Sequence, residues 1–100
     1  MRAQELIEIL KEQREELSEK FFVKRLGLFG SFVRGEERPD SDVDILVEFY
    51  RPVSLFKFLE LEDYLSELLG RQVDLVSRKA LKPSIGKRVI EEVVFVEQDL

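Results

Sequence analysis

The chain has 100 residues, of which 16 are basic and 21 acidic, giving a net charge of −5, and it contains neither cysteine nor histidine. These absences exclude disulfides, thiolate or imidazole metal ligands and Ser-His or Cys-His catalysis, so a bound metal would need oxygen ligands. The acidic balance also argues against broad binding of DNA or RNA, which depends on a basic surface.

A chain of this length can form one hydrophobic core, and 44% of its residues are hydrophobic, so we expect a single domain over residues 1–100. No stretch reaches the unbroken apolar length of a membrane span, and the first residues lack the apolar core of a secretory signal. We therefore expect a cytoplasmic protein with no membrane partner.

Apolar residues at helical spacing predict an amphipathic helix over residues 3–19, and a run rich in apolar residues predicts a partly buried strand over 21–29. Residues 42–49 alternate clearly between apolar and polar side chains and predict a second strand. A well-buried helix is expected over residues 54–69, followed by a short strand over 72–77.

Strand, helix and strand in succession favour a right-handed parallel crossover, so the strands 42–49 and 72–77 are expected to lie side by side. Pro83 predicts the start of a last helix, and residues 93–96 are expected to form a final edge strand. The pattern predicts an α/β fold in which helices flank a small sheet.

Gly30 and Ser31 end the first predicted strand, and Ser31 is a good N-cap for a short helical turn that Gly35 ends. The unpaired backbone N–H groups at such a junction can bind an anion, and Arg34, one turn later, could reach the same phosphate. The alternative is a capped turn with a solvated arginine, because a Gly-Ser turn by itself is not specific.

Asp42 and Asp44 are two positions apart on the predicted strand, so their side chains project from one face with Cα atoms about 6.6 Å apart. Two carboxylates at this separation repel by roughly 2–3 kcal/mol at an effective dielectric of about 20. A divalent cation would remove this cost, whereas the alternative is a strand whose outer face is simply hydrated. The segment lacks the glycine and the later ligand of an EF-hand calcium loop.

Asp74 lies in the middle of the short strand 72–77, between Val73 and Leu75. An aspartate inside an apolar strand is a poor choice for packing, which favours a functional role. If this strand pairs with 42–49, Asp74 comes beside Asp42 and Asp44 and adds a third carboxylate to the predicted site.

Three segments together resemble the motif of the minimal nucleotidyltransferases, the small branch of the DNA polymerase β-like superfamily. They are Gly30-Ser31-Phe32-Val33-Arg34-Gly35, then Ser41-Asp42-Val43-Asp44-Ile45-Leu46-Val47, then Val73-Asp74-Leu75-Val76. The resemblance covers essentially the whole chain and departs mildly at Val33, where alanine is commoner in the family. It implies a polymerase β-like nucleotidyltransferase fold, with a small mixed sheet flanked by helices.

The resemblance further implies an enzyme that transfers a nucleoside monophosphate from an NTP, expected to be ATP, to an acceptor hydroxyl and releases pyrophosphate. Gly30 and Ser31 would bind the β- and γ-phosphates of the nucleotide, assisted by Arg34. The predicted nucleotide site therefore lies at the end of the first strand.

The same resemblance assigns the catalytic and metal-binding roles to the three carboxylates. Asp42 and Asp44 would hold two Mg²⁺ ions, with Mn²⁺ as a substitute, and Asp74 would bind the catalytic metal and help to activate the acceptor hydroxyl. Displacement at phosphorus needs such charge neutralisation and a polarised nucleophile.

Many members of this family are antitoxins encoded beside a HEPN-domain ribonuclease toxin, to which they add AMP at a tyrosine. A HEPN toxin is therefore the expected partner, in a homo- or hetero-oligomer. Two alternatives are an antitoxin that acts by binding alone and a nucleotidyltransferase that modifies a small molecule. Basic residues after the third strand could contact triphosphate or an acidic partner, or form a solvated face: Arg78, Lys79, Lys82, Lys87 and Arg88.

Overall fold

A four-stranded mixed sheet in the order β3-β2-β1-β4 forms the centre of the computed structural model, which describes residues 2–96. β1 pairs antiparallel with both β2 and β4, whereas β2 pairs parallel with β3. The predicted side-by-side arrangement of the second and third strands is confirmed, and so is the α/β class. The strands are β1 (Val23–Phe29), β2 (Val43–Phe49), β3 (Val73–Ser77) and β4 (Val94–Phe95).

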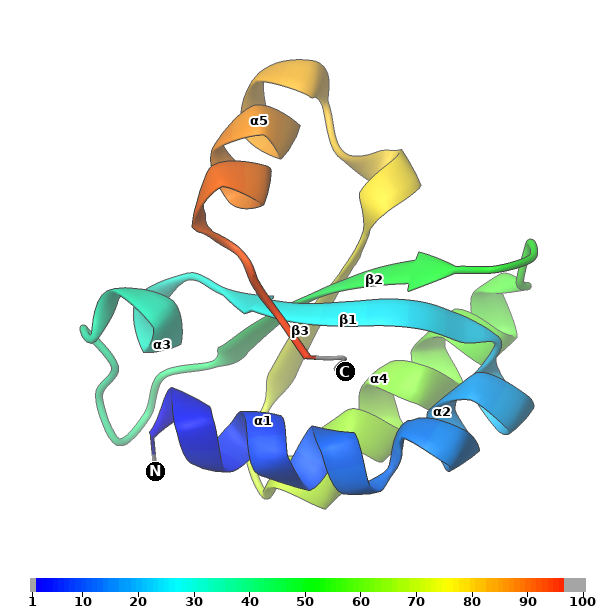
Figure 1. Ribbon diagram of the computed structural model, residues 1–100, viewed down its shortest axis with the longest axis horizontal. Coiled ribbons are helices and arrows are strands. Elements are labelled where there is room, and N and C mark those ends of the chain that lie inside the picture. Colours follow the sequence, from blue (N-terminus) through cyan, green and yellow to red (C-terminus); the bar gives the residue numbers. More distant parts are fainter. Residues whose placement is uncertain (1, 97–100) are drawn as a thin grey trace.

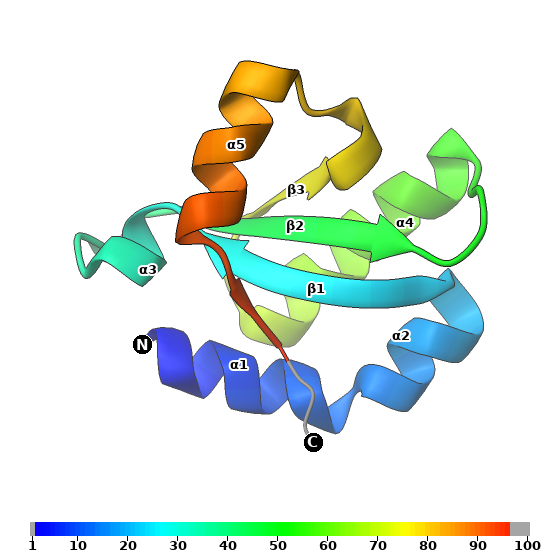
Figure 2. The same cartoon turned by 45° about the horizontal axis from the view of Figure 1, so that its top comes forward.

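The helices are divided unequally between the two faces of this sheet (Figure 1). Three of them, α1, α2 and α4, cover one face, and α5 stands on the other, as the tilted view in Figure 2 also shows. Within residues 2–96, no helix has the length and apolar character needed to cross a membrane. The helices are α1 (Ala3–Glu12), α2 (Arg14–Phe21), α3 (Ser31–Arg34), α4 (Leu55–Leu69) and α5 (Pro83–Glu92), with a 3-10 turn at Arg78–Ala80.

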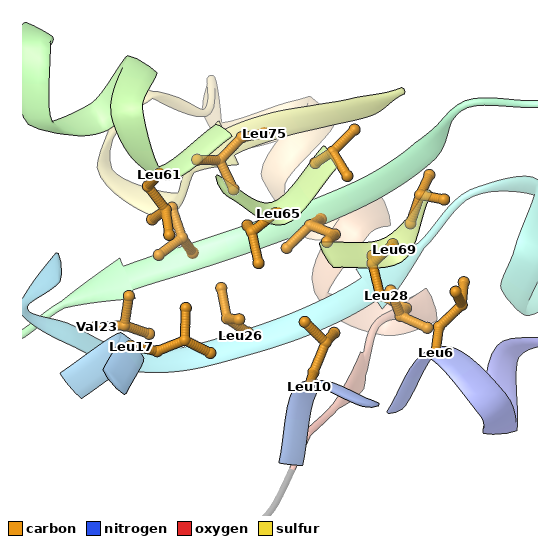
Figure 3. Close-up of a cluster of buried hydrophobic side chains, with 14 of the residues drawn as sticks. Leu6, Leu10, Leu17, Val23, Leu26, Leu28, Leu61, Leu65, Leu69 and Leu75 are labelled. Atoms are coloured by element: carbon orange, nitrogen blue, oxygen red, sulfur yellow. The ribbon is translucent and has the colours of Figure 1, made fainter. Parts of the chain in front are cut away.

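The hydrophobic core fills the space between the sheet and the three helices α1, α2 and α4 (Figure 3). Along β2, Val43, Ile45 and Val47 are fully buried in this core, as the alternation predicted. Because side chains alternate along a strand, Asp44 and Glu48 project from the opposite face, on the side of α5. The packing of one face of β2 therefore determines where its acidic residues point.

The single helix predicted over residues 3–19 is wrong. The chain bends at Gln13, which has φ −103° and ψ 13° and separates α1 from α2. The bend allows Leu10 of α1 and Leu17 of α2 to reach the same core beneath a twisted sheet. The Tyr64 hydroxyl of α4 donates a hydrogen bond to Oε1 of Gln13 at 3.1 Å, which ties the bend to the neighbouring helix.

The expectation of a well-buried helix over residues 54–69 holds for only part of α4. Leu61 and Leu65 are fully buried, but the first turn is not: Leu55 is 71% exposed and Phe56 is 86% exposed. The boundaries follow the predicted caps, because the Ser54 hydroxyl accepts a hydrogen bond from the Lys57 N–H at 3.1 Å. The sheet covers the later turns of α4 and leaves its first turn as an apolar surface patch.

Candidate active site

The parallel pairing of β2 and β3 sets two of the predicted site residues opposite each other. Asp44 of β2 and Asp74 of β3 are register partners, with Asp44 partly buried and Asp74 exposed. Asp42 is also exposed and lies one residue before β2 begins at Val43. The three carboxylates thus share one end of the β2–β3 pair, although Asp42 belongs to the preceding loop rather than to the strand.

Asp44 is the electrostatic centre of this group. Burial raises the pKa of its carboxyl group, and the negative charges of Asp74 and Asp42 raise the pKa further, against the opposing effect of Arg34. Such crowding of like charge favours a cation, and aspartate oxygens are the ligands that Mg²⁺ and Mn²⁺ prefer. Within residues 2–96, no three carboxyl groups converge tightly enough to form a metal site. The donor chemistry fits a divalent ion, but the side chains are not gathered around one.

The turn at Gly30 lies directly against Asp44. Phe29, the last residue of β1, is the register partner of Asp44, and the chain then turns at Gly30 with φ 81° and ψ −151°. A Cβ atom on Gly30 would overlap Oδ2 of Asp44, so only glycine allows this close approach. The predicted phosphate-binding turn and the predicted metal-binding carboxylate are therefore neighbours in space.

The expected N-cap at Ser31 is wrong, because Gly30 occupies that position and Ser31 is the first residue of α3. No side chain caps this helix; instead, the Gly30 carbonyl accepts hydrogen bonds from the N–H groups of Val33 and Arg34. Gly35 ends the turn in a left-handed conformation, as predicted. The Ser31 side chain is partly buried and makes no capping hydrogen bond.

Glu92, the last residue of α5, is a site residue that the sequence did not indicate. Its Oε2 accepts a hydrogen bond from the Gly30 N–H at 2.6 Å, and its Oε1 accepts one from the Arg34 guanidinium at 2.9 Å. The Gly30 N–H, followed by Arg34, lowers the pKa of the Glu92 carboxyl group. Arg34 also donates to Oε1 of Glu36 at 2.9 Å. Two of the three residues predicted to bind phosphate, Gly30 and Arg34, are therefore in contact with a carboxylate.

The absence of a side chain at Gly27 of β1 allows the end of α5 to pack close to the strand and reach this turn. Gly27 has no side chain, and a Cβ atom there would overlap the Val93 side chain, which follows Glu92 directly. Beyond Val93, β4 pairs with Gly27 and Leu28, confirming the predicted edge strand. The Arg25 guanidinium lies over the Phe95 ring, 3.5 Å from its centroid. These contacts anchor the segment that carries Glu92.

Arg71 fixes the loop that leads to Asp42. Its guanidinium donates hydrogen bonds to the carbonyl oxygens of Pro39 and Ser41, at 3.1 and 3.3 Å. The Ser41 hydroxyl in turn accepts from the Arg38 N–H at 2.8 Å. The position of Asp42 thus depends on a side chain from the turn between α4 and β3.

The basic residues that follow β3 are all exposed, and Arg78 is paired: its guanidinium donates to Oε2 of Glu48 at 2.6 Å. Glu48 lies four positions beyond Asp44 along β2, on the same face. The Arg78–Glu48 pair therefore lies on the same face of the sheet as Asp44, near the end of β2 at Phe49.

In this mixed sheet a Gly-Ser turn lies against Asp44 of β2, and Asp74 lies opposite on the adjacent strand β3. This arrangement is typical of domains that transfer nucleotides. The family model for the nucleotidyltransferase domain matches residues 10–96. The chain therefore belongs to the nucleotidyltransferase family, in its minimal branch.

Three similar proteins support this assignment. The chain is 54% identical over 93 residues to the protein adenylyltransferase MntA of Thermococcus cleftensis, covering 93% of this chain and 94% of that protein. A solved structure assigned as a minimal nucleotidyltransferase has a TM-score of 0.74 and 36% identity, with coverage of 94% and 95%. The structure of a tri-AMPylated Shewanella oneidensis HEPN toxin in complex with an MNT antitoxin has a TM-score of 0.66 at 19% identity, with coverage of 93% and 73%, which shows the shared fold.

Proposed function

We propose that this chain is a protein adenylyltransferase, which transfers AMP from ATP to a tyrosine hydroxyl of a HEPN-domain toxin and so acts as its antitoxin. The observation that carries the proposal is the placement of the Gly30 turn against Asp44, with Asp74 opposite on β3. The relative named as a protein adenylyltransferase and the complex of an AMPylated HEPN toxin with an antitoxin support the choice of donor and acceptor.

The turn between β1 and α3 binds the polyphosphate of the nucleotide in this proposal. The Gly30 N–H and the Ser31 hydroxyl contact the β- and γ-phosphates, and the Arg34 guanidinium adds a charge-assisted, bidentate contact. Because Gly30 has no side chain, Asp44 packs directly against the turn, which brings a proposed metal ligand next to the phosphates. The leaving pyrophosphate is thereby held in a fixed position.

The proposed metal ligands are the three carboxylates Asp42, Asp44 and Asp74. They would hold two Mg²⁺ ions, or Mn²⁺ in their place, which would neutralise charge on the phosphates and lower the pKa of the acceptor hydroxyl. Asp74 is exposed, so in this proposal it can reach the acceptor and accept its hydroxyl proton. The acceptor oxygen then bonds to the α-phosphorus as the bond to pyrophosphate breaks.

An apolar patch on the first turn of α4 supports a protein as the acceptor. Phe56 is 86% exposed and Leu55 71%, and Leu59, one turn later on α4, is 45% exposed. Exposed apolar clusters of this kind are typical of protein interfaces. Lys57 in this turn is paired with Glu60 at 3.2 Å, so the patch carries both charges at its border, and the proposed partner surface is mainly apolar.

The proposal is tested by incubating the chain with α-labelled ATP, Mg²⁺ and the HEPN toxin encoded beside it. We expect the label to appear on the toxin with the wild-type chain and to disappear with Asp44→Ala. Asp63→Ala is the matched control, because Asp63 is an exposed aspartate on α4 and should leave transfer unchanged. A toxin that is inhibited without being labelled would reject the enzymatic mechanism in favour of neutralisation by binding alone.

A further inference from the structure

Glu92 presents two carboxylate oxygens to two donors that a phosphate would use. One oxygen accepts from the Gly30 N–H at 2.6 Å and the other from the Arg34 guanidinium at 2.9 Å. A carboxylate and a terminal phosphate both offer paired anionic oxygens to such donors. The donors cannot serve both anions fully, since Gly30 has a single N–H group.

The charge of Glu92 also opposes an incoming triphosphate. It lies close enough to Asp44 to raise the pKa of that carboxyl group, which places a further negative charge at the predicted nucleotide site. A triphosphate that entered with Glu92 still in place would meet this charge as well as the aspartates. Glu92 must leave its two donors for the polyphosphate to bind them.

The side chain can move without unfolding the helix. It is 26% exposed and belongs to the last residue of α5, while the adjacent Val93 stays fixed in the gap at Gly27. Arg88 lies one turn earlier on α5, and its charge already lowers the pKa of Glu92. Residues four apart on a helix can form an ion pair, so Arg88 is an alternative partner for the displaced carboxylate.

We propose that Glu92 is an internal competitor of the nucleotide, which occupies the Gly30 N–H and Arg34 in the free enzyme and is displaced by the triphosphate. This inference rests on the proposed nucleotide site, but it does not depend on which acceptor is modified. It makes Glu92 a residue that sets the affinity for nucleotide rather than one that takes part in the transfer.

The test measures the binding of a non-hydrolysable ATP analogue with Mg²⁺ to the full chain by calorimetry. We expect Glu92→Gln and Glu92→Ala to bind the analogue about tenfold more tightly than the wild type, because the competing anion is lost. Glu91→Gln is the matched control: it removes the same charge from the neighbouring, exposed residue and should change the affinity by less than about twofold.

A second measurement follows the Gly30 amide by NMR in the absence of nucleotide. Glu92→Ala should shift its resonance and speed its exchange with solvent, whereas Glu91→Gln should do neither. Glu92→Gln keeps the size of the side chain, so a folded variant is available even if the alanine variant is destabilised.

The possible outcomes separate this inference from the proposed function. Equal or weaker binding by both folded Glu92 variants would overturn the inference, and a fall in kcat at unchanged affinity would instead make Glu92 a catalytic residue. If neither the wild type nor any variant binds nucleotide, the proposed function falls together with the inference. Tighter binding by the Glu92 variants without labelling of a toxin would uphold the inference and reject only the proposed acceptor.

Discussion

Gly30 and Asp44 are packed so closely that the glycine has no room for a Cβ atom, which would overlap Oδ2 of the aspartate. Gly30 directly follows β1, Asp44 lies on β2, and the register pair of Phe29 with Asp44 brings the two residues together. A change of backbone shape at the turn is therefore transmitted directly to the carboxylate.

Gly30→Ala should impair the site although it removes no functional group. The new methyl group must push Asp44 aside, and φ of 81° is strained for alanine by about 1–3 kcal/mol. We expect nucleotide transfer to fall by about 100-fold, because small displacements of reacting groups have large effects on rate. Transfer of AMP to the acceptor is the measurement.

Gly70→Ala provides the control for backbone strain alone. Gly70 has a similar φ of 68°, but no atom lies within 4 Å of the position its Cβ would take. This variant should lose about 1 kcal/mol of stability, less than Gly30→Ala, because its left-handed conformation (φ 68°, ψ 24°) is one that alanine can adopt, and it should keep its activity. Equal losses of activity in the two alanine variants would contradict a specific role for the contact between Gly30 and Asp44.

Asp44→Asn should make the protein more stable at neutral pH while abolishing transfer. The raised pKa of Asp44 means that its charged form is less favourable in the folded chain than in the unfolded chain. Its stabilising contribution is complete below the ordinary aspartate value, near pH of about 4, and is lost as the pH rises through the raised pKa. The variant should therefore melt at a higher temperature at pH 7, by about 4–8 °C for each kcal/mol relieved.

The same melting experiment tests the proposed metal site. The difference in Tm between Asp44→Asn and the wild type should shrink as the pH is lowered through the raised pKa of Asp44, because the wild-type carboxyl group then becomes neutral. Added Mg²⁺ should raise the Tm of the wild type more than that of the variant, since a ligand that binds the folded state stabilises it. Equal responses to Mg²⁺ would argue that Asp44 does not bind the ion.

Arg71→Gln should weaken metal binding without unfolding the chain. The change removes the hydrogen bonds from the guanidinium to the carbonyl oxygens of Pro39 and Ser41, each worth about 1 kcal/mol. The loop before Asp42 then loses its support, and we expect the affinity for Mn²⁺ to fall several-fold in a titration. Arg14→Gln, on the exposed surface of α2, should leave the affinity unchanged. Unaltered Mn²⁺ binding by Arg71→Gln would show that the loop needs no such support.

Phe56→Ser should weaken the association with the toxin and leave the fold intact, because this side chain is 86% exposed. Central aromatic side chains at interfaces commonly contribute about 2 kcal/mol or more, which corresponds to a loss of affinity of about 30-fold. Ile85→Ser is the comparison, since Ile85 is a 52% exposed apolar residue on α5. Binding that is lost in Ile85→Ser and kept in Phe56→Ser would place the partner on the opposite face of the sheet.

Local patterns were enough to predict most of the sheet and the neighbourhood of its carboxylates. The alternation along β2 placed Val43 and Ile45 in the core and Asp44 on the other face, which is what burial in the structure shows. The sequence order of β2, α4 and β3 was sufficient to expect a parallel pair, and this pair makes Asp44 and Asp74 register partners.

What the sequence could not indicate depends on contacts between distant segments. The bend at Gln13 lies within a continuous helical pattern and is explained only by packing against the sheet and Tyr64. The exposure of Phe56 depends on where the sheet stops supporting α4. Glu92 contacts a residue 62 positions away, and in the sequence it looks like any acidic residue near the end of a helix.

The wide separation of Gly30 and Glu92 also has a consequence for the order of synthesis. The turn, Asp44 and Asp74 all leave the ribosome before Glu92, because they precede it in the chain. Until α5 has emerged and settled at Gly27, the Gly30 N–H and Arg34 have no carboxylate from Glu92. Any state of the chain in which α5 is not docked on the sheet therefore leaves the Gly30 N–H and the Arg34 guanidinium without Glu92 and accessible to an external anion.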